Sequence, residues 1–151
     1  MKAVKDQKKS KGTALVTGAS RGIGKAIAAA LAADGWAVTG TSRNPKRMSA
    51  EERVPGVRYL PLDISRRASI DALVRKVRGV DLLVNNAGAS AIGSAEDTAP
   101  EDVRALFDSN YFGPVRLTQA LLPSMRRKRR GTIIFIGSMA EWFPRAAEPT
   151  R

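Results

Sequence analysis

The chain has 151 residues, 26 Lys and Arg against 14 Asp and Glu, a net charge of +12, and neither Cys nor His. This length predicts one domain with a buried core. The absence of Cys excludes disulfides and thiolate chemistry. His, the commonest metal ligand, is also absent, so we expect no metal. No apolar run is long enough to span a membrane, and the charged residues 1–11 lack the apolar centre of a signal peptide. We therefore expect a basic tail over 1–11, a domain over 12–151, no membrane association and a cytoplasmic location.

Much of the positive charge lies in this tail and in the run RRKRR at 126–130, which follows a helical pattern. The run is either a solvated helix end, where cations complement the dipole, or a nucleic-acid or nuclear-import patch. No aromatic residue interleaves it, as a platform for single strands would require. The solvated helix end is favoured, and nucleic-acid binding is the weaker alternative.

The stretch TGASRGIG at 17–24 lies between an apolar, β-prone segment at 12–16 and strong helix formers at 25–33. A strand-to-helix turn is the context in which glycines of this kind bind a dinucleotide, because the helix N-terminus offers free N–H groups and a positive dipole end to a pyrophosphate. A plain turn with glycines for steric reasons is the alternative.

Each glycine of this turn has an expected task. Gly18 permits a tight turn, and Gly22 leaves space for a phosphate to approach the backbone. Gly24 lets the helix pack closely on the strand. The spacing is Gly-x-x-x-Gly-x-Gly, a variant of the commonest dinucleotide fingerprint.

Strands and helices alternate along the rest of the chain. The apolar and polar patterns predict strands at 36–41, 57–62, 80–84 and 131–136, a short helix or loop at 45–56, and helices at 65–78 and from about 100 to 125. Thr98 to Glu101 has the sequence of a capping box with Pro in the first turn. Gly113 and Pro114 predict a break or kink in the last helix.

The strand at 36–41 ends at Ser42 and Arg43, about twenty residues past the glycine turn, where an acidic residue would bond the ribose 2′-hydroxyl of NAD. A carboxylate would repel a 2′-phosphate, whereas the guanidinium of Arg43 can bind one through two hydrogen bonds. Arg21 would add a second positive charge. The pattern favours NADP over NAD, and the alternative is that both arginines are surface charges.

An ordered set of motifs resembles the short-chain dehydrogenase/reductase family: TGASRGIG, Asp63, NNAG at 85–88, Asn110 and Ser138. The resemblance implies an α/β fold, a Rossmann-type doubly wound parallel sheet, here truncated after the fifth strand. It implies hydride transfer between NADP(H) and a small carbonyl or alcohol substrate. The cofactor contacts that it implies are Thr17, Gly18, Ser20, Arg21, Gly22, Ile23, Gly24, Arg43, Asp63, Ile64, Asn86, Ala87 and Gly88.

Three positions match family residues with individual roles. The resemblance implies that Asp63 contacts the adenine ring, and helix capping is a second, compatible role for it. It implies two catalytic residues: Asn110, which bends its helix and holds a water of the proton relay, and Ser138, which hydrogen-bonds the substrate carbonyl.

The chain departs from the family after Ser138. The catalytic Tyr of the family lies about a dozen residues after the Ser, with a Lys one helical turn later, but residues 139–151 contain neither. Tyr is the general acid or base and Lys lowers its pKa, so we expect an incomplete, inactive oxidoreductase domain. A non-catalytic nucleotide-binding or regulatory module is the alternative.

The expected sheet ends on the apolar strand at 131–136, which has no charge or Pro to prevent pairing at the edge. The helix before it would expose Leu117, Leu121 or Leu122 if nothing further packed on it. We therefore expect the chain to self-associate.

Overall fold

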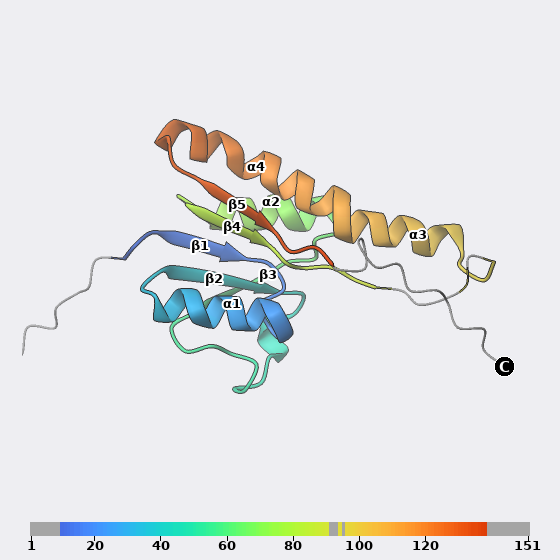
Figure 1. Ribbon diagram of the computed structural model, residues 1–151, viewed down its shortest axis with the longest axis horizontal. Helices are drawn as coiled ribbons and strands as arrows, with labels where there is room; N and C mark the ends of the chain where they lie inside the picture. The colour runs from blue at the N-terminus through green and yellow to red at the C-terminus, as the bar shows by residue number, and fades with distance from the viewer. Residues whose placement is uncertain (1–9, 91–93, 95, 139–151) are drawn as a thin grey trace, which may run out of the picture.

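A parallel sheet of five strands forms the centre of the computed structural model, which describes residues 10–90, 94 and 96–138 (Figure 1). Most of the predicted tail (1–9) and the segment 139–151 lie outside the described residues. The strands, in sheet order, are β3 (Arg58–Pro61), β2 (Ala37–Ser42), β1 (Thr13–Val16), β4 (Leu82–Asn85) and β5 (Thr132–Phe135).

The order of the strands reverses at β1, whose neighbours are β2 on one side and β4 on the other. All four pairings are parallel, so the carboxyl ends of the strands share one edge of the sheet. Open α/β sheets bind ligands outside these carboxyl ends, at the point where the order reverses. The predicted doubly wound fold is confirmed, and β5 is the outermost strand on its side among the described residues.

Helices cover both faces of the sheet (Figure 1). Helix α1 (Gly22–Ala33) lies on one face, and α2 (Arg67–Lys76) and α4 (Gly113–Lys128) lie side by side on the other. A single 3-10 turn, η1 (Pro45–Arg47), follows β2. None of the helices in the described ranges is both long enough and apolar enough to cross a membrane.

The alternation of side chains along the strands divides the core into two layers. Leu15 and Leu83 point to the α2 and α4 side and pack with Leu73 and Leu117. Alanines and valines make up most of the buried layer on the α1 side, which contains Ala14, Val16, Ala19, Ala28, Val38, Leu82 and Val84.

We predicted a break or kink near Gly113 and Pro114; the last helical region is continuous, so a break there is wrong. Helix α3 (Pro100–Phe107) passes into α4 through one π-helical turn, η2 (Asp108–Phe112). Gly113 is needed for close packing instead, because a Cβ there would lie 2.2 Å from the carbonyl oxygen of Ile64. Pro114 lies in the first turn of α4, where Pro is well tolerated.

The predicted capping box is also wrong. Helix α3 begins at Pro100, and its N-cap residue, Ala99, provides no side-chain hydrogen bond. The hydroxyl of Thr98 donates to the carbonyl oxygen of Ser94 at 2.7 Å, within the preceding turn. The motif has the right spacing, but the helix starts one residue too late for Thr98 to cap it.

Of the three leucines of α4 that we expected to be exposed, Leu117 and Leu121 are buried and Leu122 is half-buried. Leu117 and Leu121 are fully or almost fully buried and belong to the core layer that α2 shares with the sheet. Packing against α2 is enough to cover them. Exposed apolar side chains occur instead near the start of this helical region, at Phe107 and Phe112.

The basic run at the end of α4 is partly used in packing. The Lys128 ammonium donates to the carbonyl oxygen of Gly79 at 2.8 Å and lies 2.5 Å from a carboxylate oxygen of Asp81. Arg130 lies 3.6 Å from the same carboxylate, which also accepts a hydrogen bond from the Thr13 amide at 2.9 Å. The hydrogen bond from Lys128 is the main reason why the pKa of Asp81 lies below its usual value.

Candidate functional site

The side chain of Thr17 joins the carboxyl ends of β1 and β4. Its hydroxyl oxygen accepts hydrogen bonds from the amides of Asn86 and Ala87, both at 2.9 Å, and the hydroxyl donates to the carbonyl oxygen of Val84 at 3.3 Å. Thr17 is only 1% exposed. Hydrogen bonds this well buried are costly to leave unmade, so they fix the glycine turn relative to the loop after β4.

Asn86 completes this connection from the other side. Its side-chain amide donates to the carbonyl oxygens of Thr17 at 2.9 Å and Gly18 at 3.2 Å. A Cβ at Gly24 would lie 2.3 Å from both the Asn86 amide nitrogen and the Gly18 carbonyl oxygen. The expected task of Gly24 needs a correction, because its close neighbours are this turn and Asn86 rather than the strand.

The other two glycines of the turn have positive φ. Gly18, at φ +66°, makes the tight turn, and a Cβ there would lie 3.0 Å from the Ala87 Cα. Gly22, at φ +55°, has no atom within 4 Å of its Cβ position. The expected roles of the two glycines agree with this geometry, since Gly22 leaves open space at the backbone.

The N-terminus of α1 opens onto this space. The first amides of a helix have no partner within it, and the N-cap residue, Arg21, provides no side-chain hydrogen bond. Ser20 is half-buried, whereas Ile23 is 62% exposed at the same turn. An uncapped helix end behind an open glycine backbone fits a pyrophosphate in both shape and charge.

Two residues that sequence analysis missed support the turn from β2 and β3. The Gly18 amide donates to the hydroxyl oxygen of Thr41 at 3.2 Å, and the Ala19 amide donates to the carbonyl oxygen of Thr41 at 2.8 Å. The hydroxyl of Tyr59 donates to the carbonyl oxygen of Ala19 at 3.3 Å and accepts a hydrogen bond from the Val54 amide at 3.2 Å. The sequence signal for Thr41 was a Thr at the carboxyl end of a predicted strand.

The two arginines of the predicted cofactor preference are both exposed. Arg21 is the N-cap of α1, and Arg43 follows β2 directly. In the described part of the chain neither guanidinium forms an ion pair. Both are therefore available to an anion at this edge of the sheet.

Asp63 and Ile64 follow β3. A carboxylate oxygen of Asp63 accepts hydrogen bonds from the amide and the hydroxyl of Ser65 at 3.1 and 2.7 Å. Helix α2 begins only at Arg67, with Arg66 as its N-cap, so helix capping by Asp63 is wrong. Ile64 is buried and packs against Gly113, which places the start of α4 beside this loop.

Asn110 lies within the π-helical turn and is held by the loop after β4. Its side-chain oxygen accepts from the Ala89 amide at 2.8 Å, and its side-chain nitrogen donates to the Ala89 carbonyl at 2.8 Å. A Cβ at Gly88 would lie 3.2 Å from the same side-chain oxygen. The pair of hydrogen bonds fixes Asn110 and the NNAG loop relative to each other.

Asn85, the first residue of NNAG, was not among the predicted site residues. It is 4% exposed, and its side-chain nitrogen donates to the hydroxyl oxygen of Thr118 in α4 at 3.2 Å. Its side-chain oxygen is the one buried side-chain acceptor without a partner among the described residues. The sequence signal was an Asn at the end of a strand that is otherwise apolar.

Ser138 lies three residues beyond β5 and is exposed. The predicted site residues lie in the loops after the carboxyl ends of strands or in the first turn of α1, apart from Asn110 in η2. Hydrogen bonds and close approaches join Thr17, Gly18 and Gly24 to the NNAG loop, and that loop to Asn110. The described contacts do not join Arg21 or Arg43 to this group.

A reversed parallel order, a glycine turn and an uncapped helix at the reversal point define a dinucleotide-binding α/β domain of the Rossmann type. The family model for short chain dehydrogenases matches residues 12–150. The chain belongs to this family of oxidoreductases, whose cofactor is a nicotinamide nucleotide.

Comparison with individual relatives agrees with this family membership. The chain is 40% identical over 129 residues to a 3-ketodihydrosphingosine reductase of Bacteroides thetaiotaomicron, covering 83% of this chain and 46% of that protein. It is 37% identical over 139 residues to the NADP-dependent 3-hydroxy acid dehydrogenase YdfG of Salmonella typhi, covering 87% and 56%. A solved short-chain dehydrogenase from Streptomyces avermitilis superposes with a TM-score of 0.79 at 38% identity, covering 89% and 51%. The chain therefore spans about half the length of the relatives it matches.

Proposed function

We propose that this chain is the NADP(H)-binding part of an oxidoreductase that transfers a hydride between NADP(H) and a carbonyl or alcohol substrate. The observation that carries the proposal is the uncapped N-terminus of α1 behind the open backbone of Gly22. The nucleotide, when bound, supplies or accepts the hydride. The protein residues bind it, orient it and hold the substrate oxygen.

Three groups of residues would hold the nucleotide. The turn and the first amides of α1 would bind the pyrophosphate, because they present N–H donors and a positive dipole end. Asp63 and Ile64, at the carboxyl end of β3, would lie beside the adenine. Residues 86–88 would follow the nucleotide along the carboxyl end of β4.

The preference for NADP over NAD is assigned to Arg43, with Arg21 as a second positive group. Both side chains are exposed, and no ion pair within the described residues neutralises them. A guanidinium binds a 2′-phosphate through charge-assisted hydrogen bonds that NAD cannot make. The name of the Salmonella relative, which calls it NADP-dependent, supports the same preference.

Equilibrium titration of the 151-residue chain with NADPH and with NADH tests this assignment. We expect NADPH to bind about ten-fold or more tightly than NADH, since charged hydrogen bonds contribute about 1.5–3 kcal/mol. Arg43→Asp should reverse the order. Arg126→Asp, which changes the net charge equally but lies in the last turn of α4, should leave it unchanged. Equal affinity of the unmodified chain for both nucleotides would overturn the assignment.

The catalytic residues proposed for this chain are Asn110 and Ser138. Ser138 would hydrogen-bond the substrate oxygen, and Asn110 would hold a water of the proton relay from its fixed place in η2. Neither is a proton donor with a pKa near neutrality, and residues 139–151 provide no Tyr or Lys. We propose that the 151 residues alone bind the nucleotide without turnover, as a nucleotide-binding module would.

We also propose that this chain self-associates through β5. Ile134, Phe135 and Ile136 are 41%, 55% and 36% exposed at the edge of the sheet. An apolar edge strand without charge or Pro presents open N–H and C=O groups to another strand. A second copy can satisfy these groups by pairing.

A further inference from the structure

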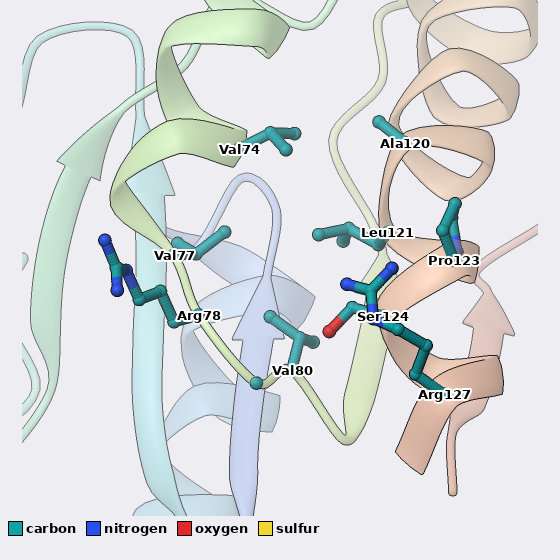
Figure 2. A pocket seen from close by; sticks show the side chains of 10 residues that line it. Val74, Val77, Arg78, Val80, Ala120, Leu121, Pro123, Ser124 and Arg127 are labelled. Atoms are coloured by element: carbon teal, nitrogen blue, oxygen red, sulfur yellow. The ribbon is translucent and has the colours of Figure 1, made fainter. Parts of the chain in front are cut away.

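A cavity lies between α2 and α4, on the face of the sheet that these two helices cover (Figure 2). Its volume is about 270 Å³, and it is lined in part by Val74, Val77, Val80, Leu121, Ser124 and Arg127; we call it the α2–α4 cavity. Val80 precedes the amino end of β4, whereas the NNAG loop follows the carboxyl end. The cavity is therefore separate from the nucleotide site.

The two sides of the α2–α4 cavity differ in chemistry. Val74 and Val77 come from the end of α2 and Val80 from the loop after it, and together with Leu121 they present an apolar wall (Figure 2). Ser124 and Arg127 come from consecutive turns of α4, and Figure 2 shows the hydroxyl and the guanidinium close together beside that wall. A ligand here would meet hydrocarbon on one side and strong hydrogen-bond donors on the other.

The charge of the cavity favours an anion. Two arginines, Arg78 and Arg127, belong to the lining, and no Asp or Glu does. Figure 2 shows the Arg78 side chain pointing away from the cavity, so Arg127 carries the positive charge that a ligand would meet. Neither guanidinium forms an ion pair within the described ranges. Arg75 and Lys76 add further positive charge in the last turn of α2. This surplus opposes the partial negative charge at the C-terminal ends of the two helices.

We propose that the α2–α4 cavity is a second ligand site, which binds a short aliphatic carboxylate. The alkyl chain lies against the valines and Leu121, and the carboxylate accepts hydrogen bonds from Arg127 and Ser124. Its volume of about 270 Å³ is just below the roughly 300–1,000 Å³ of ordinary ligand pockets, which suits a short chain rather than a long lipid. The proposal does not depend on the nucleotide preference.

Octanoate is the probe for the test. 1-Octanol, which has the alkyl chain without the carboxylate, and acetate, which has the carboxylate without the long chain, are the comparison compounds. We follow titrations of the 151-residue chain by calorimetry and by the NMR signals of the valine and leucine methyl groups. Octanoate should shift the methyl signals of Val77, Val80 and Leu121. Octanol should bind about ten-fold more weakly, because it lacks the carboxylate. Acetate should bind about a hundred-fold more weakly or worse, because it lacks the alkyl chain.

Two arginine variants give the decisive comparison. Arg127→Gln should weaken octanoate binding about ten-fold through the lost charged hydrogen bond. Arg126→Gln removes the neighbouring charge, which does not line the cavity, and should leave the affinity unchanged. Equal loss in both variants, equal binding of octanol, or shifts at Val103 in the exposed groove beside Phe107 instead of in the cavity would each overturn the proposal.

Discussion

The β1–β4 part of the sheet and its β5 edge differ in burial and in hydrogen bonding. Between β1 and β4, Thr17 is 1% exposed and bonds three backbone groups, and Asn86 bonds two more. At the β5 edge, Phe135 is 55% exposed, and Ser138 lies on the surface beyond it. The proposed nucleotide side of the site thus lies among closely joined residues, whereas the proposed substrate side borders open apolar surface.

Overpacking the nucleotide turn should have the largest effect on stability. Gly24→Ala places a Cβ 2.3 Å from the Gly18 carbonyl oxygen and the Asn86 amide. We expect the free energy of unfolding to fall by about 2–3 kcal/mol, measured in urea, since neither backbone nor a bonded amide yields easily.

Gly22→Ala is the matched control for Gly24→Ala. Its Cβ would enter open space, so only the positive φ of +55° costs stability, about 1 kcal/mol. The same Cβ would occupy the space proposed for a phosphate. The loss in the free energy of NADPH binding should therefore exceed the loss in the free energy of unfolding. A Gly24→Ala protein as stable as the unmodified chain would contradict the packing described for the turn.

Removing the Thr17 hydroxyl should have the next largest effect. Thr17→Val leaves the amides of Asn86 and Ala87 without their acceptor in a buried place. We expect a loss of about 2 kcal/mol in the free energy of unfolding. Thr39→Val is the control, because the Thr39 side chain is also buried but makes no hydrogen bond to the described residues. Similar losses in both variants would show that the network around Thr17 contributes nothing special.

Asp81 allows a test by pH at the amino edge of the sheet. Its pKa is lowered in the folded chain, mainly by the hydrogen bond from Lys128, so its contribution to stability is present above its ordinary pKa of 3.8. That contribution is lost as the pH falls through the lowered value. Asp81→Asn should therefore cost about 1 kcal/mol at neutral pH and progressively less in acid.

The exposed pair of Lys11 and Asp34 provides the control for Asp81. Asp34→Asn should change the free energy of unfolding by less than about 0.5 kcal/mol at any pH, since surface ion pairs contribute little. If Asp81→Asn costs as much in acid as at neutral pH, the ionised carboxylate is not what Lys128 and Arg130 stabilise.

The smallest expected change in stability is at the β5 edge, where the effect is on association. Phe135→Lys should alter the free energy of unfolding by less than about 0.5 kcal/mol, because the side chain is more than half exposed. It should lower self-association in sedimentation experiments, since a charge on an edge strand opposes pairing. Ile23→Lys changes an apolar residue away from β5 that is similarly exposed, and it should not lower self-association. Self-association that persists in Phe135→Lys would show that the contact between copies is not at β5.

The sequence predicted the sheet and the place of the candidate site in it, because both depend on local patterns. Apolar strands, glycines at a strand-to-helix turn and NNAG after a buried strand determine the element order and the edge that carries the candidate site. The start of each helix was less predictable. Thr98 bonds Ser94 within its own turn, and no pattern distinguishes that choice from a cap on α3.

Contacts between distant elements could not be predicted from sequence. Gly113 resembles a helix breaker, but its neighbour is Ile64, 49 positions earlier in the chain. The burial of Leu117 and Leu121 depends on the position of α2 beside α4 and not on a further element next to β5. Thr41 supports the glycine turn only because β2 pairs with β1.

These 151 residues, as we propose, contain a working nucleotide site without a working active site. One experiment tests both halves of this proposal: the folded chain is titrated with NADPH by fluorescence, in the presence of a carbonyl substrate, while NADPH oxidation is recorded in the same sample. We expect saturable binding at one site and no oxidation above that of the buffer. A folded chain that fails to bind NADPH, or one that oxidises it steadily, would contradict the proposal.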